Sequence, residues 1–132
     1  MEAGIHHISL KADGVQQYRA ILDFYQNVLS CPLIHQWGEG EQAGAMLNLG
    51  NVLLEVMATG GAGLEKGRFA HIAFRSEDVD HSIEQVRRAG RPILVEPKDV
   101  NLGGTYPARV GFCLGPAGEE IEFFQDQREN PA

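Results

Sequence analysis

The chain has 132 residues, of which 43% are hydrophobic and 22% charged, the composition of an ordinary globular domain. No apolar run approaches the roughly 18 residues of a membrane span, and the first residues lack the charged start and apolar stretch of a secretion signal, so we expect a cytoplasmic protein. The formal net charge of -7, without a cluster of Lys and Arg, argues against nucleic acid as a partner. Cys31 and Cys113 are too few for a disulfide framework and are expected to be reduced.

The first half of the chain predicts a strand, a helix and three further strands. Residues 5–11 alternate between the two sheet faces with the period of two that marks a strand. A helix is expected after Asp13, a suitable N-cap, and Pro32 prevents it from continuing beyond Ser30-Cys31. Its apolar stripe, at a spacing of about 3.6 residues, consists of Tyr18, Ile21, Leu22, Tyr25, Val28 and Leu29. Strands are then predicted at residues 33–37, 43–49 and 51–57.

The second half of the chain predicts the same order of elements. A strand at residues 69–75 precedes a helix that begins near Ser76 and ends at Gly90 as a C-cap. Strands follow at residues 93–96, 108–114 and 120–125, with Pro116-Ala117-Gly118 as the last turn. Residues 59–63 have the glycine-rich composition of a flexible linker. We therefore expect one domain, residues 1–132, made of a module at about 4–58 and a module at about 68–126.

Histidine and glutamate recur at corresponding positions of the two halves. His7 and His71 are 64 residues apart (71 minus 7), and each lies third in a similar strand pattern. Glu55 and Glu122 are 67 residues apart (122 minus 55), and each interrupts the apolar last strand of its half. A buried carboxylate needs a cation, a metal or a path to water, because burying an unpaired charge costs several kcal/mol.

Two imidazoles and two carboxylates suit nickel, cobalt, zinc, iron(II) or manganese, and do not suit calcium or magnesium. The joint recurrence of both residue types favours a metal site over four unrelated structural residues. The remaining histidines, His6, His35 and His81, are interpreted as structural or surface residues, so replacing His6 should matter little.

Several motifs resemble the vicinal-oxygen-chelate superfamily, which includes glyoxalases, bleomycin-resistance proteins and dioxygenases. They are the His7-Ile8 strand, the helix segment Leu22-Asp23-Phe24-Tyr25, the Leu54-Glu55 pair, the second His71-Ile72-Ala73-Phe74 strand, and the closing run from Gly115 to Phe123. The resemblance implies an α+β fold in which two βαβββ modules form an open eight-stranded cup around a divalent metal. It also implies a homodimer, whose cups can combine modules of two chains.

The ligand set His7, Glu55, His71 and Glu122 is similar to that of glyoxalase I, and this resemblance implies a lactoylglutathione lyase-like metalloenzyme. Such an enzyme would isomerise the adduct of a 2-oxoaldehyde and a thiol through a metal-bound enediolate. Glu122 would be the general base, with Glu55 as the other catalytic carboxylate. Nickel, cobalt or zinc would be the expected metal.

Substrate contacts are expected from two cations and from two positions implied by the glyoxalase resemblance. Lys11 and Arg75 lie on the strand faces that carry the histidines and would hold a substrate carboxylate. Asn101, in the glycine-rich run 101–105, belongs to a segment similar to the glyoxalase loop that closes over the substrate. Lys11 stands where glyoxalases usually carry Arg, and Thr59 where they carry a glutathione-binding Asn, so the use of glutathione is left open.

Other functions remain open on the same scaffold. The first alternative is another metal-dependent isomerase, such as an acyl-thioester epimerase, in which Gln usually replaces Glu55. Extradiol dioxygenases and fosfomycin-modifying transferases lack a carboxylate at that position and are disfavoured. The alternative from a different class is a drug-binding or other small-molecule-binding protein without metal. The sequence leaves the native metal, the identity of the base and the sharing of the site between two chains open.

Overall fold

The computed structural model describes residues 4–59, 67–116 and 119–129. The chain divides into two compact units, one of residues 7–70 and one of residues 1–6 together with 71–132. We call them the first and the second unit and describe each by itself. The division crosses strand β1 (Ile5–Lys11) between His6 and His7, and strand β5 (Phe69–Arg75) between Ala70 and His71.

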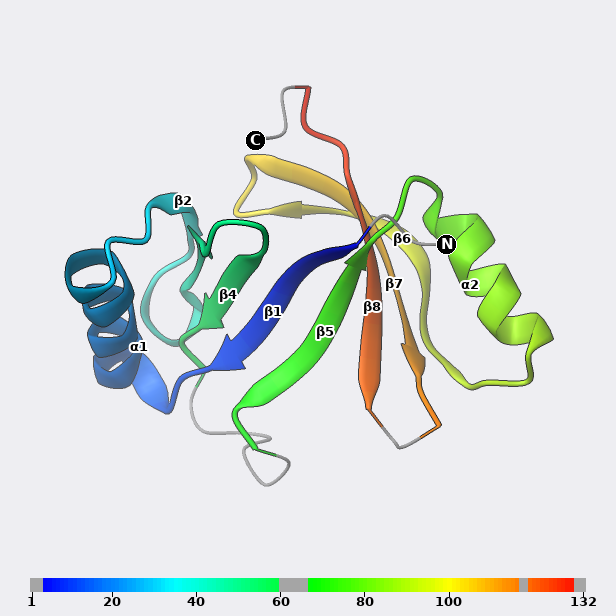
Figure 1. Ribbon diagram of the computed structural model, residues 1–132, viewed down its shortest axis with the longest axis horizontal. Helices are drawn as coiled ribbons and strands as arrows, with labels where there is room; N and C mark the ends of the chain where they lie inside the picture. The colour runs from blue at the N-terminus through cyan, green and yellow to red at the C-terminus, as the bar shows by residue number, and fades with distance from the viewer. Residues whose placement is uncertain (1–3, 60–66, 117–118, 130–132) are drawn as a thin grey trace. The chain divides into compact units, whose positions relative to one another are not determined.

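The first unit contains one α-helix and four strands (Figure 1). Its elements are β1 (Ile5–Lys11), α1 (Gly14–Asp23), the π-helix η1 (Phe24–Val28), β2 (Leu33–Trp37), the 3-10 helix η2 (Gly40–Gln42), β3 (Gly44–Asn48) and β4 (Leu53–Met57). The strand order is β2-β3-β4-β1, in which β4 and β1 are parallel and the other pairs antiparallel. Tyr18 and Leu22 of α1 pack with Leu54 and Val56 of β4, so the helix covers one sheet face and leaves the face of His7 and Glu55 uncovered by it.

The second unit repeats this plan with β5 (Phe69–Arg75), α2 (Val79–Arg88), β6 (Ile93–Leu102), β7 (Tyr106–Leu114) and β8 (Glu120–Asp126). The strand order is β5-β8-β7-β6, and β5 and β8 are parallel. Val79 and Ile83 of α2 pack with Cys113 and Phe123 on one sheet face. Gly111 of β7 permits this close approach, because a Cβ there would lie 2.7 Å from Cγ1 of Ile83.

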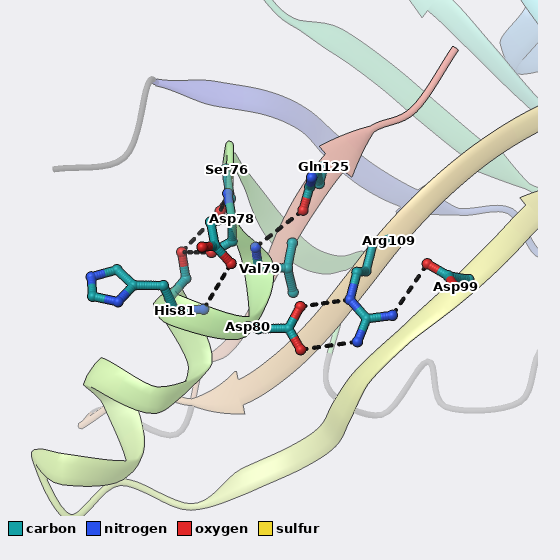
Figure 2. Close-up of polar contacts among 9 residues, drawn as sticks. Ser76, Asp78, Val79, Asp80, His81, Asp99, Arg109 and Gln125 are labelled. Carbon is teal, nitrogen blue, oxygen red and sulfur yellow. Dashed lines mark hydrogen bonds and ion pairs between the residues drawn. The ribbon is translucent and has the colours of Figure 1, made fainter.

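Polar contacts fix the start of α2 to the strands of the second unit (Figure 2). Asp78 is the N-cap, and its carboxylate accepts a hydrogen bond of 3.1 Å from the backbone N–H of His81. The N–H of Val79 donates to the side-chain oxygen of Gln125 on β8. Arg109 of β7 donates two hydrogen bonds to Asp80 and one to Asp99. The helix predicted to begin near Ser76 therefore begins at Val79, three residues later.

Three predicted features of the first helix and of β6 differ in the structure. Asp13 stands at the N-cap position but its carboxylate makes no cap, and its N–H instead donates to the side chain of Gln17. The helix continues beyond Asp23 as a π-helix, and Val28 is exposed although it belongs to the predicted apolar stripe. Strand β6 extends to Leu102, six residues beyond the predicted end.

The α+β fold with two βαβββ modules, predicted from the repeat, is confirmed element by element. Residues 60–63 of the predicted linker, and Ala117 and Gly118 of the predicted last turn, lie outside the described residues. None of the described helices is long and apolar enough to span a membrane.

Candidate metal centre

The first unit places one histidine and one glutamate side by side on two parallel strands. His7 of β1 and Glu55 of β4 lie on the sheet face opposite α1, with His7 Nε2 3.7 Å from Glu55 Oε1. Both are buried, with exposed fractions of 1% and 7%. A buried carboxylate is stabilised by a nearby positive charge, which a protonated imidazole or a bound cation can supply.

The second unit builds the same pair from the corresponding strands. His71 of β5 and Glu122 of β8 are held on neighbouring parallel strands, and His71 Nε2 lies 2.9 Å from Glu122 Oε1. The ring of Phe112 meets the imidazole of His71 edge to face at 5.2 Å, which fixes the ring orientation. The structure thus brings together His7 with Glu55, and His71 with Glu122.

The donor set and its burial fit a divalent transition metal. Imidazole nitrogen and carboxylate oxygen are ligands of zinc, nickel, cobalt, iron and manganese, and burial shields them from competing water. Ser9, next to His7 on the same strand face, has a buried hydroxyl oxygen for which the described residues offer no hydrogen-bond partner.

A polar network that the sequence did not predict lies at one end of the second unit. His6 Nε2 lies 3.1 Å from the hydroxyl of Tyr106, and that hydroxyl donates to Asp126 at 2.9 Å. The Arg128 guanidinium donates to both oxygens of Asp126 and stacks 3.9 Å above the Tyr106 ring. The imidazole of His6 stacks on Phe124 at 4.1 Å. His6 is therefore structural, in agreement with its interpretation from the sequence, but it is fully built into the core.

The network also shifts the acidity of its members. Burial raises the pKa of Tyr106 far above its usual value, and its hydrogen bond to Asp126 raises it further. Burial alone would raise the pKa of Asp126, but hydrogen bonds from Arg128 and Tyr106 outweigh it and hold that pKa below its usual value. At neutral pH the network therefore consists of a neutral phenol and a carboxylate paired with a guanidinium. One feature of the sequence could have indicated this network: the alternation along the last strand, which places Phe124 and Asp126 on the same face as Glu122.

The structure places each predicted substrate-binding residue within its own unit: Lys11 and Thr59 in the first, Arg75 and Asn101 in the second. Lys11 ends β1 and is half-buried, whereas Arg75 ends β5 and is exposed. The Thr59 hydroxyl donates to the backbone oxygen of Ala12 at 2.8 Å, which closes the junction between β1 and α1. Asn101 lies in β6, and only residues 103–105 of the predicted glyoxalase loop form a turn, that of the β6–β7 hairpin. The prediction of a loop across residues 101–105 was therefore wrong for its first two residues.

Comparison with known proteins assigns the chain to a family. The family model for the Glyoxalase/Bleomycin resistance protein/Dioxygenase superfamily matches residues 4–123. The chain belongs to this superfamily, whose name spans enzymes and a resistance protein. None of the curated protein sequences compared shows significant similarity to the chain.

Proteins of known structure that share this fold have different activities. A variant of methylmalonyl-CoA epimerase from Streptomyces coelicolor, in complex with 2-nitronate-propionyl-CoA, is 22% identical, with a TM-score of 0.79 over 99% of this chain and 100% of that one. Methylmalonyl-CoA epimerase from Mycobacterium tuberculosis is 17% identical, with a TM-score of 0.77 over 97% and 91%. A variant of 4-hydroxymandelate synthase from Streptomyces coelicolor is 15% identical, with a TM-score of 0.70 over 97% of this chain and 50% of that one. These likenesses confirm the fold, and the substrate must be argued from the site.

Proposed function

We propose that the chain is a metal-dependent isomerase or lyase that moves a proton on the carbon next to a substrate carbonyl, with His7, Glu55, His71 and Glu122 as ligands of one divalent metal. The observation that carries the proposal is the repeated pair: an imidazole beside a buried carboxylate at the same position of both modules, with His7 buried and His71 half-buried. Two unrelated His–Glu pairs would not be expected at corresponding positions of the two modules.

The bound metal would supply the positive charge that stabilises the oxyanion formed when a carbon next to a carbonyl loses its proton. The chain's own groups do the rest. The imidazoles hold their ring orientation through neighbours such as Phe112, and the carboxylates provide the base. One glutamate removes the proton from a carbon. Either the same glutamate returns it to the neighbouring carbon, or the other glutamate delivers a proton to the opposite face of the first carbon.

We propose Glu122 as the general base. It is 5% exposed and lies on β8, whose Phe124 and Asp126 continue the same strand face. Glu55, the corresponding residue of the other module, is the second catalytic carboxylate. Two bases from two modules would suit an epimerisation, in which the proton leaves one face of a carbon and returns to the other.

The first candidate substrate is the hemithioacetal of a 2-oxoaldehyde and a thiol, because both modules carry a carboxylate as in glyoxalase I. A second candidate is a 2-substituted acyl thioester. It is supported by the fold shared with methylmalonyl-CoA epimerases, one of them in complex with a coenzyme A ester. Both substrates need the same enolising step and differ in the carbon that receives the proton.

One experiment compares the two substrates. Protein loaded with nickel, cobalt or zinc is incubated in deuterated water with methylglyoxal and glutathione, or with methylmalonyl-CoA, and the product is followed by NMR. Turnover of the first would make the protein a lactoylglutathione lyase, and deuterium at carbon 2 of the second would make it an epimerase. If the metal-loaded protein turns over neither substrate and catalyses no deuterium incorporation with any of the metals, the proposed chemistry on these substrates is wrong.

Two further expectations belong to this proposal. The resemblance to the superfamily predicts a homodimer, which sedimentation equilibrium would test. A small-molecule-binding protein without metal is the competing function, and a folded chain that takes up no metal would favour it.

A further inference from the structure

Ser9 is a buried polar residue to which the proposed chemistry assigns no role. It lies in β1 two residues after His7, on the same sheet face, and is fully buried. Within residues 4–59, 67–116 and 119–129, its hydroxyl is the one buried side-chain oxygen or nitrogen without a hydrogen-bond partner. Leaving a buried hydroxyl unsatisfied costs folding free energy, so such a group calls for an explanation.

The neighbour of Ser9 on β4 is the proposed ligand Glu55, and Met46 of β3 lies on the other side of Glu55. Ser9 is the register partner of Glu55 in the parallel ladder, and Glu55 is the register partner of Met46 in the antiparallel one. The three side chains therefore form a row on one face, and all three are buried. Ser9 makes no hydrogen bond to the Glu55 carboxylate, although they are neighbours. The donor proton of the hydroxyl remains available for a ligand beside Glu55.

The second module shows what the fold alone requires at this position. Ala73 corresponds to Ser9: it lies two residues after His71, is the register partner of Glu122, and is fully buried. A methyl group therefore satisfies the packing of this position in the repeat, and the oxygen of Ser9 is additional to it. An additional hydroxyl with no structural partner is better explained by a ligand than by the fold.

We infer that the Ser9 hydroxyl is a substrate-binding group that donates a hydrogen bond to a negatively charged substrate oxygen held beside Glu55. This inference rests on the proposed function and adds a specificity: the substrate presents an oxyanion to the first module. A hydrogen bond to a charged acceptor is stronger than one between neutral groups, so its loss is measurable.

The test compares Ser9→Ala with Ser82→Ala and with the unchanged protein. Ser82 is a matched control because it is equally buried on α2, but its hydroxyl is satisfied by Ser76 at 2.9 Å and by the backbone oxygen of Asp78. Three quantities are measured by calorimetry: the melting temperature of the metal-free protein, the Kd for nickel, and the Kd of the nickel-loaded protein for acetohydroxamate. This probe presents two adjacent oxygens and a negative charge when bound.

We expect metal-free Ser9→Ala to melt at or above the temperature of the unchanged protein, and Ser82→Ala to melt a few degrees below it, about 3–5 °C. Nickel affinity should stay within about twofold in both variants, whereas Ser9→Ala should bind acetohydroxamate about tenfold more weakly. If Ser9→Ala and the unchanged protein bind acetohydroxamate equally well, the inference is overturned while the proposed function stands. If Ser9→Ala then also melts at a lower temperature, the hydroxyl binds a structural water instead. Failure of the unchanged protein to bind nickel would overturn the proposed function, and the inference with it.

Discussion

Glu122 carries two proposed roles, as a ligand and as the base, and its amide analogue separates charge from shape. Glu122→Gln keeps the size of the side chain but removes the negative charge and the capacity to accept a proton. We expect turnover of the active substrate to fall by about 10²–10⁴-fold, the usual contribution of a general base, with the fold intact by circular dichroism. Glu84→Gln, at an exposed glutamate of α2 that pairs with Arg87, is the control and should keep full activity. Full activity in Glu122→Gln would exclude it as the base.

His6 tests whether the strand register around the first ligand is correct. The expectation from the sequence was that His6→Ala would matter little, but the imidazole is 2% exposed, stacked on Phe124 and hydrogen-bonded to Tyr106. We now expect His6→Ala to lower the free energy of unfolding by about 2–4 kcal/mol, measured by urea titration, because a buried ring and its hydrogen bond are lost. Metal affinity should be retained. Loss of metal from a folded His6→Ala, with metal retained by His7→Ala, would mean that the register is wrong by one residue.

Asp126 links stability to pH. Its pKa in the folded chain is below its usual value, so its carboxylate stabilises the folded state at any pH above the unfolded pKa of about 3.9. This contribution is lost as the pH falls through the lowered folded pKa, where the carboxylate becomes protonated. We therefore expect the free energy of unfolding to drop between about pH 5 and pH 2, and to drop less steeply in Asp126→Asn. Urea titrations across this range measure the slope, and equal slopes would contradict the account.

At the scale of the elements, the contact of α2 with β7 depends on a missing side chain. A Cβ at Gly111 would lie 2.7 Å from Cγ1 of Ile83 and 3.3 Å from Val79, so Gly111→Ala forces the helix away from the strand. We expect a loss of about 1–3 kcal/mol in the free energy of unfolding, the usual cost of overpacking. The penalty should shrink in an Ile83→Ala background, which removes the contacting atoms. An equal penalty in both backgrounds would show that the contact is not the cause.

The elements that the sequence predicted well are those whose two faces carry different kinds of residue, apolar on one face and polar on the other. Strand β1 alternates because Leu10 packs against the helix side while His7 and Ser9 occupy the other side, and this alternation is visible in the sequence. The glutamates were identifiable because each has apolar residues on both sides, Leu54 and Val56 around Glu55, and Ile121 and Phe123 around Glu122. Ser9 was placed on the correct face, but its missing partner could not be read from the sequence, since satisfaction of a hydroxyl depends on neighbouring strands.

The elements predicted poorly are those in which the strand alternation or the helical period is interrupted. Pro97 made a ten-residue strand β6 hard to recognise, because proline lacks the N–H that a ladder needs. The structure accommodates Pro97 where the register between β6 and β7 shifts, from Val95 to Lys98. The helical period likewise predicted burial of Val28 and Leu29, but η1 takes a wider π-helical turn, and both side chains are exposed.

At the scale of the whole molecule, the duplication explains why one sequence could predict both the fold and the two His–Glu pairs. Among the described residues, each module supplies one α-helix, four strands and one His–Glu pair, so evidence for a feature in one module supports it in the other. The polar network of Tyr106, Asp126 and Arg128 with His6 belongs to the second unit alone and could not be predicted from the repeat. It joins His6 to Tyr106, 100 positions further along the chain, a pairing that no local pattern reveals.

The stoichiometry of metal binding tests the central claim most directly, because the proposed ligands come from two modules. Metal-free protein is titrated with nickel by calorimetry and the bound metal counted by mass spectrometry, for the unchanged chain and for His7→Ala and His71→Ala. If the four residues hold one metal, the unchanged chain binds about one nickel ion, and each single substitution weakens binding by at least about 100-fold. Two independent ions per chain, with each substitution removing one, or no bound metal in any folded protein, would contradict the account.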